Sequence, residues 1–131
     1  EIRMDAVYEH LYITERQRAL SEWFRCLRPG GKLIVNWIPD FERASELYRV
    51  GAYGPTDEFP LWNIEMLERV TNGVSDLFSG NPLQLHKGLF TPRTVRLEIE
   101  DAGFVIDRIG LVVYPGERGA AYNICVEAHK P

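Results

Sequence analysis

The sequence predicts an α/β fold, and two stretches of the chain carry this prediction. In the first, a helix over residues 15–27 ends at a Pro-Gly-Gly turn, and an apolar strand over residues 32–38 follows. Proline cannot continue a helix, and glycine takes the positive φ angles that a helix end and a tight turn need. In the second, a helix that begins at Thr91-Pro92 is followed by two strands. Helix, tight turn and buried strand are half of a βαβ unit, the unit that builds doubly wound sheets.

The first part of the chain leads into the 15–27 helix. The segment Glu1–Asp5 is too short to assign from its own pattern, and residues 6–13 indicate a turn or a short helical segment. Thr14, with Gln17 three residues later, has the spacing of a capping box, so the helix is expected to begin directly after Thr14. Its apolar residues recur at helical spacing, which predicts one buried face. Arg16 is expected on the outer face.

The middle of the chain reads as a strand followed by a long insertion. The run Leu-Ile-Val at residues 33–35 is typical of a strand that is covered on both faces. A second helix is expected over residues 40–50 and a third over 61–70, within a helical insertion at about 41–90. Insertions after the carboxyl end of a strand are where doubly wound folds build substrate sites, so this one is expected to line a substrate pocket.

The last part of the chain predicts a helix and an antiparallel hairpin. Thr91 has the properties of an N-cap, Pro92 suits the first helical position, and Gly103 suits the helix end. Strands are expected over residues 104–113 and 121–128, joined by a turn. Three acidic residues of the helix are expected on a solvated face: Glu98, Glu100 and Asp101.

Composition limits the kinds of protein that this chain can be. Its 131 residues are the length of one domain. A net charge of −4 argues against a nucleic-acid partner, which would require a basic face. No apolar run approaches the roughly 20 residues that span a bilayer, so no membrane partner is expected. Cys26 and Cys125 lie too far apart in sequence to predict a redox pair, and a reduced, cytoplasmic setting is expected.

Three segments carry a family resemblance. They are Glu9-His10, the Leu-Arg-Pro-Gly-Gly-Lys run at 27–32, and the His-Lys-Gly-Leu-Phe-Thr-Pro run at 86–92. In this order they resemble the C-terminal half of class I S-adenosylmethionine-dependent methyltransferases of the type 11-like group. The resemblance implies that residues 1–131 are a single partial domain, half of a Rossmann-like sheet that ends in an antiparallel hairpin. It implies methyl transfer to a hydroxyl or amine of a small molecule or glycan, with S-adenosylmethionine as the cofactor of the complete enzyme.

The family's glycine-rich cofactor loop has no counterpart in this sequence. No Gly-x-Gly-x-Gly motif occurs, so the chain alone is expected to bind the cofactor poorly. It is also expected to expose a sheet edge where the family's first strands belong. The chain is then a fragment of a longer enzyme, a half-domain completed by another chain, or a swapped homodimer. The alternative function is a non-catalytic half-domain that acts as a binding or oligomerisation module. A different α/β enzyme is disfavoured, because no Walker loop, Gly-x-Ser-x-Gly motif or cysteine–histidine zinc spacing occurs.

The resemblance implies a catalytic pair and a cofactor segment. Glu9 and His10 would follow the family's fourth strand, where His10 could act as a general base; alternatively, the pair only braces the next helix. Some relatives bind a divalent metal through Glu-x-x-Glu-His, but Ala6 replaces the first Glu, so no metal site is expected. Met4, Asp5 and Ala6 match the segment whose backbone lies beside the cofactor, with Asp5 near its amino group. Asp5 is equally well explained as a turn residue.

The candidate substrate-binding residues come from three segments. They are Asn36, Trp37, Asp40, Trp62, His86 and Lys87. The first three lie at the end of the central strand, Trp62 lies in the insertion, and the last two belong to a segment that covers the pocket mouth in the family. The alternatives are that the two tryptophans belong to the core and that His86-Lys87 is a solvated loop.

Overall fold

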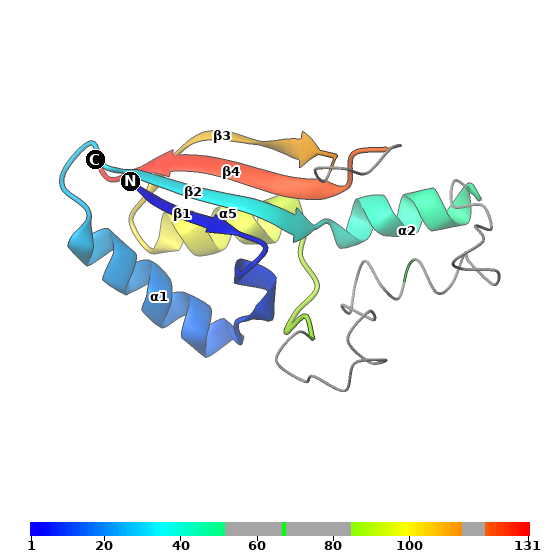
Figure 1. Ribbon diagram of the computed structural model, residues 1–131, viewed down its shortest axis with the longest axis horizontal. Helices are drawn as coiled ribbons and strands as arrows, with labels where there is room; N and C mark the ends of the chain where they lie inside the picture. Colours follow the sequence, from blue (N-terminus) through cyan, green and yellow to red (C-terminus); the bar gives the residue numbers. More distant parts are fainter. Residues whose placement is uncertain (52–66, 68–84, 114–119) are drawn as a thin grey trace.

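A computed structural model of the protein describes residues 1–51, 67, 85–113 and 120–131 (Figure 1). Within these ranges the chain forms four strands and three α-helices, with one short 3-10 helix. The strands are β1 (Ile2–Asp5), β2 (Lys32–Pro39), β3 (Val105–Val112) and β4 (Asn123–His129). The helices are η1 (Tyr8–His10), α1 (Ile13–Cys26), α2 (Phe41–Arg49) and α5 (Pro92–Asp101).

The four strands form one mixed sheet in the order β1-β2-β4-β3. β1 and β2 are parallel and are joined through α1, as a βαβ unit requires. β4 is antiparallel to both of its neighbours, β2 and β3, which confirms the predicted final hairpin. The α/β class is therefore confirmed. Both α1 and α5 lie on the same side of the sheet in Figure 1, so the doubly wound arrangement stays a prediction.

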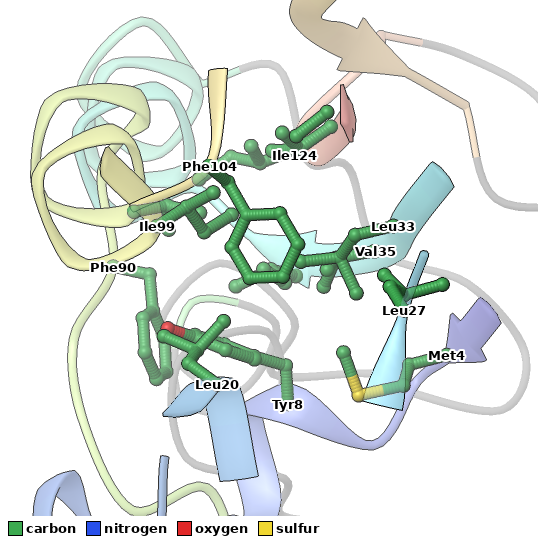
Figure 2. Close-up of a cluster of buried hydrophobic side chains, with 14 residues drawn as sticks. Met4, Tyr8, Leu20, Leu27, Leu33, Val35, Phe90, Ile99, Phe104 and Ile124 are labelled. Carbon is green, nitrogen blue, oxygen red and sulfur yellow. The ribbon is translucent and has the colours of Figure 1, made fainter. Parts of the chain in front are cut away.

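The core lies between this side of the sheet and the two helices (Figure 2). Leu20 of α1 and Ile99 of α5 meet Val35 of β2 and Ile124 of β4, and each is at most 1% exposed. Burial of an aliphatic side chain of this size contributes about 1.5–3 kcal/mol. The sheet and both helices are thus stabilised by one shared cluster of apolar side chains.

The turn before β2 explains why the sequence has two glycines there. Gly30 has a φ of +75°, a conformation that glycine adopts without steric cost. A Cβ on Gly31 would lie 2.7 Å from the Arg28 carbonyl oxygen, so this position has no room for a side chain. The predicted Pro-Gly-Gly turn is confirmed, with a different reason for each glycine.

The starts of the two later helices also agree with the sequence. The Asp40 carboxylate accepts a hydrogen bond from the Glu42 amide at 3.1 Å and caps α2. The Thr91 hydroxyl accepts one from the Thr94 amide at 3.2 Å and caps α5, with proline directly after it. Gly103, with a φ of +98°, follows the end of α5.

The predicted start of α1 is wrong. The N-cap is Tyr12, not Thr14, and Thr14 lies inside the first turn. The Glu15 carboxylate accepts a hydrogen bond from the Tyr12 amide at 2.7 Å, which satisfies a donor that the helix itself leaves unpaired. The acidic residue of the capping interaction is therefore Glu15, and Gln17 plays no part in it.

Arg16 is buried, which contradicts its expected place on the outer face. Its side chain forms two hydrogen bonds to the Glu98 carboxylate of α5, from Nε at 2.8 Å and from Nη2 at 3.0 Å. Nη1 donates to the Leu11 carbonyl oxygen at 2.7 Å, and the Tyr8 hydroxyl donates to Glu98. The expected solvated face is therefore wrong for Glu98 as well. Arg16 lies one turn before Leu20, so helical spacing already put it on the buried face.

Much of the predicted insertion at about 41–90 lies outside the described residues. This applies to the third helix at 61–70 and to Trp62. Of the insertion, the structure describes α2, Leu67 and residues 85–90. Within the described ranges, no helix combines the length and the apolar character that crossing a membrane requires.

Candidate functional site

Two predicted groups of site residues meet where β1 ends, beside Asn36 in the second half of β2. These strands are parallel, so their carboxyl ends lie at the same edge of the sheet (Figure 1), and Asp5 pairs with Asn36. The Asn36 side-chain amide donates to Asp5 Oδ1 at 2.7 Å, and the Ala6 amide donates to the Asn36 carbonyl oxygen at 3.1 Å. A predicted cofactor segment and a predicted substrate residue are therefore in direct contact.

The backbone at this edge adopts uncommon conformations. Among the described residues, Ala6 and Trp37 are the non-glycine residues with positive φ, at +51° and +69°. Each of them directly follows a member of the Asp5–Asn36 pair, and the β2–β4 register shifts between Val35 and Ile38. A left-handed conformation costs an L-residue roughly 1–2 kcal/mol. Such residues concentrate at functional sites, which supports this edge as the candidate site.

The three residues of the predicted cofactor segment differ in their environment. Met4 is 7% exposed and packs in the core cluster, as Figure 2 shows, so only its backbone is available at the edge. Asp5 is exposed and Ala6 is half-buried. Of the three side chains in this segment, the Asp5 carboxylate is therefore the exposed polar group that is available to a ligand.

Glu9 is a buried carboxyl group on η1. Its residue is 2% exposed, and its Oε2 atom has no hydrogen-bond partner among the described residues. Burial raises the pKa of Glu9 from its ordinary value of 4.5 to about 7, because the charged form is poorly solvated. An acid with a pKa near neutrality can exchange protons under physiological conditions.

His10 and His86 lie beside this carboxyl group. Their ring centroids are 5.0 Å apart at an angle of 65°. Nδ1 of His10 lies 3.4 Å from the Leu85 carbonyl oxygen, and Nε2 lies 3.7 Å from Glu9 Oε1. Because a carbonyl can only accept, this geometry favours the tautomer with the proton on Nδ1 and the lone pair of Nε2 toward Glu9.

One potential ligand atom from each of Glu9, His10 and His86 lies within 4.8 Å of the other two. The segment that carries His86 is held against η1, since the Lys87 amide donates to the Glu9 carbonyl oxygen at 2.7 Å. The Lys87 ammonium lies 5.4 Å from the centroid of the Tyr12 ring. The predicted catalytic pair and the predicted His86-Lys87 segment thus lie side by side.

The remaining predicted substrate residues are distributed differently. Trp37 is half-buried at the strained edge, and its backbone amide interacts with the Cys125 thiol. Asp40 is 3% exposed and its carboxylate caps α2; burial raises the pKa of this group. Trp62 lies outside the described residues.

The sequence did not predict that Glu9, His10 and His86 converge. The expectation of no metal site rested on the local replacement of a glutamate by Ala6. His86 comes from a distant segment, and its place beside η1 depends on the tertiary structure. The sequence contained one hint of this meeting: the family resemblance placed candidate site residues both at Glu9-His10 and at His86-Lys87.

No protein-family model and no curated protein matches the sequence. Among solved structures, the chain is similar to one described as a SAM-dependent methyltransferase from Methanosarcina mazei, with a TM-score of 0.53 and 17% sequence identity. The similarity covers 98% of this chain and 57% of that protein. The chain therefore has a fold like part of a methyltransferase domain, and it spans little more than half the length of that protein.

Proposed function

We propose that this chain contributes to methyl transfer from S-adenosylmethionine to a hydroxyl or amine of a small molecule or glycan. In this proposal it forms the C-terminal part of a longer or assembled catalytic domain. The observation that carries the proposal is the methyltransferase-like fold over 98% of the chain. It is supported by two groupings of candidate site residues: Asp5 and Ala6 contact Asn36, and Glu9 and His10 of η1, which follows β1, lie beside His86.

The residues around the carboxyl end of β1 fit one part of a cofactor site. The exposed Asp5 carboxylate is oriented by Asn36, so it can accept hydrogen bonds from a cationic or amino group. The left-handed turn at Ala6 directs the chain away from the sheet and leaves this carboxylate at the end of the strand. The glycine-rich loop would come from residues or a chain other than these 131. The cofactor, when bound, would supply the methyl group from its sulfonium sulfur and would leave as S-adenosylhomocysteine, which keeps the electron pair of the broken sulfur–carbon bond.

His10 is the proposed general base. As the acceptor oxygen or nitrogen forms its bond to the methyl group, His10 Nε2 takes the proton that the acceptor loses. The Leu85 carbonyl oxygen lies 3.4 Å from the opposite ring nitrogen, Nδ1, which in the neutral ring puts the lone pair on Nε2. Glu9 stabilises the imidazolium that forms, because its Oε1 lies 3.7 Å from Nε2. Orientation of the acceptor remains the main contribution of the protein in a displacement of this kind.

Calorimetric titration with S-adenosylhomocysteine, the methylation product, tests this function. It is performed on the 131-residue chain and on the protein as its gene encodes it, with any residues that precede Glu1. We expect saturable micromolar binding by the encoded protein and weak or no binding by the chain alone. Loss of a charged hydrogen bond costs about 1.5–3 kcal/mol, so Asp5→Ala should weaken binding by about tenfold or more. Arg3→Ala, an exposed substitution on the same strand, is the control and should not weaken it. Absence of binding in both proteins would contradict the proposal.

A second candidate function is a binding or oligomerisation module without catalysis. It is favoured by the position of β1, which is an edge strand whose pairing within the described residues is with β2 alone. Parallel strands are rarely left at an open edge, because their sheets are usually covered. A second copy of the chain, or the missing half of the domain, could pair with β1.

A further inference from the structure

We propose that Glu9, His10 and His86 form a binding site for a divalent transition-metal ion of the zinc class. The site is inferred from the side chains themselves and does not depend on methyl transfer. A bound ion would occupy the lone pair of His10 Nε2, so His10 can act as the proposed general base only in the metal-free chain. It also revises the expectation of no metal site, which considered only residues close to Glu9 in sequence.

The spacing of the three side chains suits a single ion. Their potential ligand atoms lie within 4.8 Å of one another, and His10 Nε2 lies 3.7 Å from Glu9 Oε1. Two ligands of a tetrahedral zinc ion, each bound at about 2.1 Å, lie about 3.4 Å apart. The pair on η1 is close to this separation already. The ligand atoms lie within 4.8 Å of one another, so the widest separation exceeds the zinc value by at most about 1.4 Å, which a movement of the side chains would have to close.

The Glu9 carboxyl group provides an independent observation in favour of a cation. The side chain is buried, yet its Oε2 atom has no hydrogen-bond partner among the described residues. A buried polar atom without a partner is costly, and buried carboxylates are usually paired with a cation or coordinate a metal. The other carboxylate oxygen, Oε1, lies 3.7 Å from His10 Nε2, which is longer than a hydrogen bond.

Contacts around the three ligands favour the required orientation. The Leu85 carbonyl faces Nδ1 of His10, so Nε2 is the nitrogen that can bind a metal. Histidine ligands commonly donate their other ring N–H to a carbonyl or a carboxylate, which fixes the ring and the tautomer. The hydrogen bond from the Lys87 amide to the Glu9 carbonyl oxygen joins the two ligand-bearing segments.

The donor set determines the class of ion. Imidazole nitrogens suit zinc, iron, nickel and copper, whereas magnesium and calcium prefer sites made of oxygen. Two imidazoles and one carboxylate are also the protein ligands of many catalytic zinc sites. Three protein ligands leave a coordination position for water or for an oxygen or nitrogen atom of a small molecule.

Zinc titration of the full chain, freed of metal by a chelator, tests the site at constant neutral pH. Calorimetry should give one Zn²⁺ per chain with micromolar or tighter affinity. Each of Glu9→Gln, His10→Gln and His86→Gln should weaken binding by about tenfold or more. An excess of Mg²⁺ should not displace the zinc.

The controls use the other groups that could bind zinc. His129→Gln is the matched control, because His129 is the third histidine of the sequence and pairs with Asp107 at the far end of β4. Cys26→Ser and Cys125→Ser test the two free thiols. All three variants should retain the affinity of the wild-type chain.

NMR of the histidine rings provides a readout that does not depend on stability. Zinc should shift the ring signals of His10 and His86 and leave those of His129 unchanged. The same pattern should hold in the control variants, even where a substitution changes the unfolding temperature. The proposal is overturned if zinc does not bind, if His86→Gln retains full affinity, or if the His129 or cysteine variants abolish binding. Absence of a zinc-dependent shift at His10 or at His86 would also overturn it. Because no outcome uses methyl transfer, failure of this site and failure of the proposed function are distinguishable.

Discussion

At the scale of single residues, Glu9 connects burial to pH dependence. Its carboxyl group has a pKa of about 7 in the folded protein, compared with an ordinary value of 4.5. The folded state therefore keeps the proton over a range in which the unfolded state has lost it. The contribution of Glu9 to the free energy of unfolding is therefore largest below pH 4.5, the pKa of this group in the unfolded chain. It falls as the pH rises through about 7, the pKa in the folded protein.

This linkage predicts the behaviour of Glu9→Gln in chelator-treated protein. One pKa unit corresponds to about 1.4 kcal/mol, so the ionised carboxylate costs the folded state on the order of 3 kcal/mol. Between about pH 5 and pH 8 the wild-type free energy of unfolding should fall relative to that of Glu9→Gln by about this amount. Urea unfolding at both pH values measures the difference.

Glu42→Gln is the control for this prediction, because Glu42 is an exposed carboxyl group on α2. It should leave the pH dependence of the wild-type protein intact. A difference between Glu9→Gln and the wild type that stays constant with pH would show that Glu9 ionises normally in the folded state.

At the scale of elements, the Arg16–Glu98 pair joins α1 to α5. Arg16 is 4% exposed, and its guanidinium also lies 4.8 Å from the centroid of the Phe90 ring. The Tyr8 hydroxyl brings η1 into the same network. Since η1 carries Glu9 and His10, this network also fixes the position of the candidate site relative to the two helices.

Removal of one member of this pair should be strongly destabilising. Glu98→Gln leaves a buried guanidinium without a negative partner, and breaking a buried pair in this way costs about 3–5 kcal/mol. Because the Glu98 side chain is 20% exposed, we expect about 2–3 kcal/mol here. The double variant Arg16→Met with Glu98→Leu should recover much of this loss, since neither charge is then buried alone. Urea unfolding of Arg16→Met, of Glu98→Leu and of the double variant measures the coupling, and Glu98→Gln is measured beside them.

Arg96 and Glu100 provide the matched comparison on the same helix. They form an exposed pair at i,i+4 with a distance of 3.1 Å. Glu100→Gln should change the free energy of unfolding by less than about 0.5 kcal/mol. If Glu98→Gln and Glu100→Gln lowered the free energy of unfolding equally, burial of Arg16 would not be what makes the Arg16–Glu98 pair important for stability.

At the scale of the whole molecule, the sheet has two unlike edges. β3 is antiparallel to its neighbour and presents charged residues such as Asp107 and Arg108, which discourage edge-to-edge association. β1 is a short parallel strand of four residues at the opposite edge. Of the two, β1 is the edge that the fold is expected to cover.

Hydrogen exchange as a function of protein concentration tests this expectation. If a second copy pairs with β1, the β1 amides should gain protection as the concentration rises, by about tenfold or more where the dimer predominates. The β3 amides act as the internal control and should not change. Concentration-dependent protection of β3 instead of β1, with light scattering that shows a dimer, would contradict the assignment of this edge.

The sequence by itself determined the elements whose signals are local. The Pro-Gly-Gly turn, the strand after it, the Thr91-Pro92 helix start and the final hairpin were all predicted and are present. Each depends on residues a few positions apart: a cap, a turn conformation or a short apolar run. Such preferences act within one turn or one strand, so they can be recognised without knowledge of the fold.

Only the tertiary structure decided which distant residues meet. Helical spacing places Arg16 on the same face as Leu20, but its charge suits this face only because Glu98 of α5 lies opposite, and the two meet because α1 and α5 pack on the same side of the sheet. His86 joins Glu9 and His10 for a similar reason, since the segment before α5 returns to η1. The cost of burying a charge depends on the partner that it meets. That partner comes from another element, and local sequence carries no record of the pairing.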